Sequence, residues 1–85
     1  MSAEQVTTVG SQSFEVRDFY LACYLSCVGY ELVELRREGR RRVFVFKDRS
    51  SRGMDVMTYY RGHGTVPPLR FVSHVRDMKA LLHNA

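Results

Sequence analysis

The sequence has few of the residues that would tie a small domain together covalently or place it in a membrane. Its two cysteines, Cys23 and Cys27, are too few for the disulfide framework of a small secreted protein. They lie four residues apart in an apolar stretch, where a helix would bury both, so we interpret them as reduced structural thiols. No apolar run approaches the roughly 18 residues of a membrane span, and the first residues lack the pattern of a signal peptide. These absences predict a soluble, cytoplasmic protein.

The combinations of residues that catalysis or metal binding requires are also missing. The three histidines lie far downstream of the two cysteines, and no second cysteine pair completes a set of metal ligands. The glycines that flank His63 follow a predicted helix, whereas a phosphate-binding loop follows a strand. Three aspartates lie on different predicted helices, with no spacing that pairs their carboxyl groups: Asp18, Asp55 and Asp77. We therefore expect no enzymatic activity, no metal site and no cofactor.

The length and composition are those of one small folded domain. The chain has 85 residues and a mass of 9.9 kDa, with 45% hydrophobic and 26% charged residues, close to the average for soluble globular domains. Residues 1–13 are polar and have no period that could bury a face. We expect them to form a flexible N-terminal tail, and residues 14–85 to form a single compact domain.

Hydrophobic periodicity predicts three helices and one β-hairpin. Residues 16–28 are apolar around almost the whole helical wheel, which indicates a buried helix, and Gly29 can end it. The β-rich segments 30–36 and 40–48 predict the hairpin, and residues 54–60 predict a short amphipathic helix. The last helix opens at Pro67 and Pro68, and we expect it to bury Phe71, Val72, Val75, Met78, Leu81 and Leu82. The expected fold is α+β, in the order α-β-β-α-α, with a two-stranded antiparallel sheet.

The predicted hairpin has two apolar faces. A three-residue loop ending at a left-handed Gly39 would set Tyr30 opposite Phe46, Leu32 opposite Phe44 and Glu34 opposite Arg42. The opposite face of the sheet then holds Val33, Leu35, Val43 and Val45. A hairpin packed on its own helices needs to bury only one face, so either the helices wrap both sides or this second face binds a partner, such as a second copy of the chain.

Positive charge is concentrated on this hairpin and on the turn that follows it. Residues 36–52 carry a net charge of +6, whereas the rest of the chain carries −2. Eleven of the thirteen basic residues are arginine, whose planar guanidinium binds phosphate through two parallel hydrogen bonds and stacks on bases. The candidate nucleic-acid-binding residues are Arg36, Arg37, Arg40, Arg41, Arg42, Lys47, Arg49 and Arg52. The same pattern also fits an edge strand protected by charge, or a surface that docks on an acidic protein.

The apolar and turn residues resemble those of a known family of short, uncharacterised prokaryotic proteins, defined only as a domain of unknown function and found in bacterial and mobile-element contexts. The resemblance extends over residues 14–82. It is carried by Phe14, Asp18, Tyr20, Leu21, Ala22, Leu25, Gly29, Tyr30, Phe44, Val45, Phe46, Tyr60, Gly62, Val66, Phe71, Leu81 and Leu82. The resemblance implies a compact domain and supplies no reaction, ligand or catalytic residue.

Two functional hypotheses follow from the charge pattern. The first is a small accessory nucleic-acid-binding protein, whose arginine-rich hairpin contacts the backbone of DNA or RNA with little sequence readout. The second is a protein interaction module or small subunit of a larger complex, homodimeric or bound to an acidic partner, with no nucleic-acid contact of its own.

Overall fold

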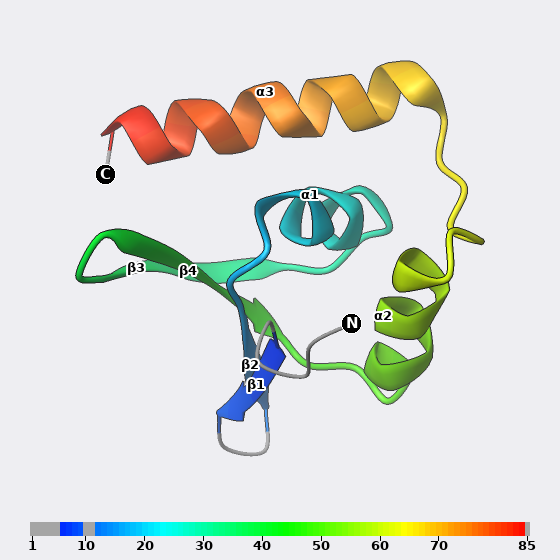
Figure 1. Cartoon of the computed structure of the whole chain (residues 1–85), viewed down its shortest axis with the longest axis horizontal. Coiled ribbons are helices and arrows are strands. Elements are labelled where there is room, and N and C mark those ends of the chain that lie inside the picture. Colours follow the sequence, from blue (N-terminus) through cyan, green and yellow to red (C-terminus); the bar gives the residue numbers. More distant parts are fainter. Residues whose placement is uncertain (1–5, 10–11, 85) are drawn as a thin grey trace.

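An antiparallel sheet of more than two strands forms the framework of the protein. The computed structural model describes residues 6–9 and 12–84. Strand β2 joins the predicted hairpin as a third strand and β1 pairs with β2 at the outer edge, so that the sheet order is β1-β2-β4-β3 (Figure 1). In chain order the elements are β1 (Val6–Val9), β2 (Ser13–Val16), α1 (Phe19–Cys27), β3 (Leu32–Glu38), β4 (Arg41–Lys47), α2 (Arg52–Tyr60) and α3 (Pro68–Asn84).

The expected order α-β-β-α-α with a two-stranded sheet is therefore wrong, although the fold is α+β. In strand β2, Phe14 and Val16 lie on either side of the charged Glu15, and both are 0% exposed in the core. Residues 6–9 and 13, which we expected in the flexible tail, lie in strands, while residues 1–5 and 10–11 of that segment lie outside the described residues. Four residues of β2 are too few to stand out from the adjoining helix pattern.

Helix α1 is the buried centre of the molecule. It begins after Asp18, whose carboxylate accepts hydrogen bonds from the backbone N–H groups of Tyr20 and Leu21, as an N-cap residue does. Gly29 (φ 101°) follows its last turn. The helix packs on the sheet face that carries Phe14, Phe44 and Phe46, and together they form the hydrophobic core.

The hairpin has a different register from the expected one, for two local reasons. Glu38 pairs with Arg41, so the loop is the two-residue segment 39–40, with Gly39 in the left-handed region (φ 61°) that such loops require. The register then shifts between Leu32 and Glu34 at a β-bulge. As a result, Leu35 pairs with Phe44 and packs against the core, and the residue inside the bulge, Val33, is half exposed.

Helix α2 is attached to the rest of the molecule by two tyrosine–aspartate hydrogen bonds. Tyr30 donates to Asp55 at 2.6 Å, and Tyr60 donates to Asp18 at 2.9 Å. Burial, followed by the hydrogen bond to Asp55, raises the pKa of Tyr30 to about 12. Asp18 therefore has two structural functions, because it caps α1 with one oxygen and binds α2 with the other.

Helix α3 crosses α1 on the side away from the sheet, and its C-terminal end lies near the turn of the β3–β4 hairpin (Figure 1). Its only fully buried residue is Met78, at 3% exposed; Phe71, Val75 and Leu82 are partly buried. Val72 and Leu81, which we expected to be buried, are exposed. Within the described residues, no helix is long and apolar enough to cross a membrane.

Replacing Tyr60 by phenylalanine is expected to lower the free energy of unfolding by about 1 kcal/mol, since the hydrogen bond to Asp18 is lost while the ring stays in place. Urea unfolding followed by circular dichroism measures this change. The matched control is Tyr20→Phe, at a residue that is 52% exposed, where we expect no significant change. Equal stability of Tyr60→Phe and wild type would contradict this function of Tyr60.

Candidate nucleic-acid interface

The structure separates the eight predicted basic residues into two groups at opposite ends of the hairpin. One group is at the turn, with Arg36, Arg37, Arg40, Arg41 and Arg42. The other is at and beyond the end of β4, with Lys47, Arg49 and Arg52. The six-residue separation of Arg41 from Lys47 along β4 corresponds to about 20 Å. The eight residues therefore do not form one contiguous patch.

The two arginines that follow β4 bind the protein itself. Arg52 donates from Nε to Asp48 Oδ1 at 3.1 Å and from Nη2 to Oδ2 at 3.2 Å, and its guanidinium lies 5.2 Å from the centre of the Phe14 ring. This hydrogen bond from Arg52 lowers the pKa of Asp48. Arg49 donates to the backbone carbonyl of Gly29 and lies 4.3 Å from the centre of the Tyr30 ring. Arg52 thus joins the start of α2 to the end of β4, and Arg49 joins the β4–α2 connection to the segment between α1 and β3.

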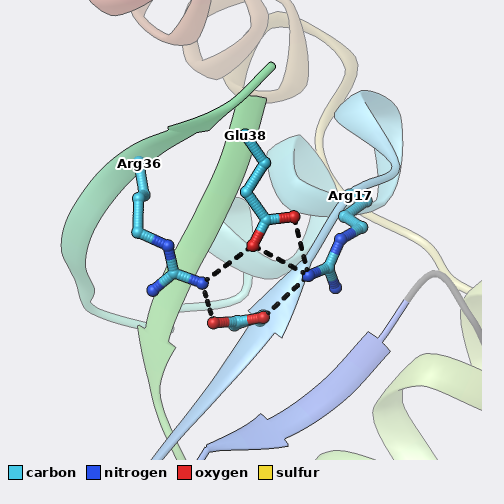
Figure 2. A network of polar contacts seen from close by, with 4 residues as sticks. Arg17, Arg36 and Glu38 are labelled. Carbon is cyan, nitrogen blue, oxygen red and sulfur yellow. Dashed lines mark hydrogen bonds and ion pairs between the residues drawn. The ribbon is translucent and has the colours of Figure 1, made fainter. Parts of the chain in front are cut away.

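A network of two arginines and two glutamates covers one side of the sheet; Figure 2 labels three of its members. Arg17 Nη2 lies 2.9 Å from Glu15 Oε1 and 3.2 Å from Glu38 Oε1. Arg36 forms an ion pair with Glu15 and lies 3.3 Å from Glu38 Oε2. Glu15 is only 6% exposed, and its hydrogen bond with Arg36 is the main cause of its lowered pKa. We call these four residues the carboxylate network.

The other four arginines of the hairpin turn have no such partner. We call them the tip arginines: Arg37, Arg40, Arg41 and Arg42. Across residues 6–9 and 12–84, none of the four has an ion pair or a side-chain hydrogen bond. Arg37 lies directly opposite Arg42 in the strand register, and like charges at such positions destabilise a sheet. Glu38 lies opposite Arg41, but its carboxylate is bound to Arg17 and Arg36.

A groove of about 380 Å³ lies beside the tip arginines. We call it the tip groove; its lining residues are Arg17, Phe19, Arg41, Arg42, Phe44 and Leu82. Three of these side chains are cationic, three are apolar and none is acidic. Arg17, Phe19 and Leu82 were not predicted as site residues, because no local motif links residues 17–19 and residue 82 to the hairpin turn. Only the packing of α1 and α3 relative to the hairpin brings them together.

The residues predicted as a dimer or partner face do not share one exposed surface. Val43 and Val45 are already buried within the single chain. Leu35 packs against the core, and only Val33 is substantially exposed. The bulge explains this separation, since inserting one residue in β3 moves the side chains on its two sides to opposite faces.

The two cysteines and the loop that contains His63 are packed as parts of the fold. Cys23 and Cys27 are free and buried, and desolvation raises the pKa of Cys23 to about 11, which keeps this thiol protonated. No cluster of three or more potential metal-binding side chains occurs in the portion of the chain that is described. Gly64, which follows His63, packs so closely on Tyr24 that an added Cβ would lie 2.7 Å from its ring.

The sheet, its covering helices and the basic hairpin define a small α+β domain. A family model described as a domain of unknown function (DUF5659) matches residues 11–84. The chain belongs to this family, which agrees with the resemblance to a domain of unknown function noted from the sequence. The prokaryotic and mobile-element context stays a prediction. No curated protein and no solved structure matches the chain.

The substitution Glu15→Gln is expected to reduce the loss of the free energy of unfolding that occurs as the pH falls below about 4.5. The folded-state pKa of Glu15 lies below its ordinary value of 4.5, so the unfolded chain takes up this proton first as the pH falls. The stabilisation by the carboxylate network is therefore complete above about pH 4.5 and is lost as the pH falls through the lower folded-state value. Urea unfolding at about pH 7 and about pH 3 measures the difference.

Glu31→Gln is the matched control for this experiment, because Glu31 is exposed and lies outside the carboxylate network. The control is expected to keep the pH dependence of the wild-type protein. If Glu15→Gln also keeps it in full, the ion pairs of Glu15 do not contribute to acid stability.

Proposed function

We propose that the protein binds the phosphate backbone of nucleic acid through the tip arginines and acts as an accessory protein with little sequence readout. The observation that carries the proposal is the contrast within the predicted basic set. Arg36, Arg49 and Arg52 have internal partners, whereas the tip arginines have none in the described part of the chain. Four arginines at one hairpin turn that have no ion-pair partner attract a polyanion.

The strand register adds a second argument for an external anion. The direct opposition of Arg37 and Arg42 is unfavourable in the free protein. A phosphate group bound between the two side chains would remove this repulsion and gain charge-assisted hydrogen bonds from both guanidinium groups. Phosphate binding would therefore relieve the repulsion between Arg37 and Arg42 that is present in the free protein.

The proposed contact surface is smaller than the set expected from sequence. Arg36, Arg49 and Arg52 are assigned to holding the fold, and Lys47 lies at the opposite end of β4. Little sequence readout is expected because the proposed contacts are made by arginines at a hairpin turn to phosphate groups, which carry no sequence information.

Fluorescence anisotropy against one single-stranded and one duplex oligonucleotide, at several salt concentrations, tests this proposal. If each tip arginine neutralises one phosphate, the slope of log K against log salt is about −2.8 for a single strand and about −3.6 for duplex DNA. The double variant Arg41→Gln/Arg42→Gln should weaken binding and reduce the slope to roughly half.

The double variant Arg61→Gln/Arg70→Gln is the charge-matched control. Both of its residues are exposed, and they lie at the end of α2 and the start of α3, on the opposite side of the molecule from the hairpin turn (Figure 1). It should retain the wild-type slope. Equal effects of the two double variants would show that net charge alone causes binding, and no binding at low salt would favour an acidic protein partner instead.

A further inference from the structure

The tip groove has a combination of surfaces that phosphate binding by itself does not need. Arg41 and Arg42 bring positive charge to it, and Phe19 and Leu82 bring apolar surface, with the almost fully buried Phe44 beneath them. Phosphate groups contact only the cationic residues of the groove, so a ligand that fills the whole groove also has an apolar part. A nucleotide provides both parts, a charged phosphate and a flat base with an apolar face.

The aromatic side of the groove is held in place before any ligand binds. The Phe19 ring lies edge-on to Tyr20 at 5.1 Å and tilted on Phe44 at 6.1 Å between ring centres. These contacts restrict its rotation, so little side-chain entropy would be lost on stacking. Leu82 is partly buried against the core and belongs to the C-terminal end of α3, which forms the other side of the groove.

We propose that the tip groove takes one unpaired base of a single-stranded nucleic acid, while Arg41 and Arg42 hold the adjoining phosphates. The inference rests on the proposed function and deepens it by naming the class of nucleic acid. In a duplex each base is paired and stacked between its neighbours, so it can reach the groove only after leaving the stack, whereas an unpaired base can do so directly.

The residues that line the tip groove also predict that it accepts different bases. Apart from the arginines, the lining residues carry no side-chain hydrogen-bond donor or acceptor that could read the edge of a base. Stacking on an aromatic ring accepts any base, since all bases have a π-face. RNA and DNA single strands share this chemistry, and parallel titrations of both distinguish the two sources.

The test compares four fluorescent ligands by anisotropy at a fixed salt concentration: single-stranded DNA, single-stranded RNA, a duplex of the same sequence, and an abasic strand with the same phosphates. Single strands are expected to bind about tenfold more tightly than both the duplex and the abasic strand. Equal affinity for the abasic and the normal strand would overturn the inference without any variant. A free nucleoside monophosphate that competes as effectively as a strand would also overturn it.

A paired substitution locates the effect in the groove. Leu82→Trp fills the groove and should reduce the preference of the protein for the normal single strand over the abasic strand. Leu81→Trp is the matched control, because Leu81 is the neighbouring exposed residue and does not line the groove. Circular dichroism and thermal unfolding establish that both variants fold; if Leu82→Trp does not, the abasic comparison decides the question.

The outcomes separate this inference from the proposed function. Loss of all nucleic-acid binding in the wild-type protein would overturn both. Binding that depends on Arg41 and Arg42, but is equal for single strands, duplex and abasic strands, would overturn the groove inference and leave backbone binding in place.

Discussion

The pairing of strand β2 with strand β4 is the interaction on which the rest of the structure depends. It places Phe14 in the core, where its ring lies 5.7 Å from that of Tyr30 and 5.9 Å from that of Phe46. On the opposite face of the same strand it places Glu15 against Arg36. One short strand therefore completes the hydrophobic core and supplies a buried negative charge to the basic hairpin.

The position of that charge decides which arginines are available to a ligand. Glu15 and Glu38 are bound to Arg17 and Arg36, and Asp48 is bound to Arg52. These three carboxylates are thus bound to arginines other than the tip arginines, and Arg37 and Arg42 stay opposed in the strand register. The assembly of the sheet therefore decides which arginines form ion pairs within the fold and which do not. This difference links the fold to the proposed binding of phosphate.

Several elements could be predicted from the sequence because their signals are local. The apolar segment of α1, the glycine that follows it, the β-rich hairpin and the opening of α3 at Pro68 all lie close to their expected positions. Strand β2 and the register of β3 could not be predicted in the same way. The four residues of β2 are stabilised by pairing with β4. The bulge at Val33 lets Leu35 pack against the core, and this contact depends on the tertiary structure.

The sequence by itself determined that the chain is a small α+β domain with its positive charge concentrated around one hairpin, because composition, periodicity and charge order are properties of neighbouring residues. Only the tertiary structure decided which of those charges have partners and that Phe19 and Leu82 meet Arg41 and Arg42 at one groove. Ion pairs and grooves join residues far apart in the chain, and their positions depend on strand order, register and helix packing, which no local pattern encodes.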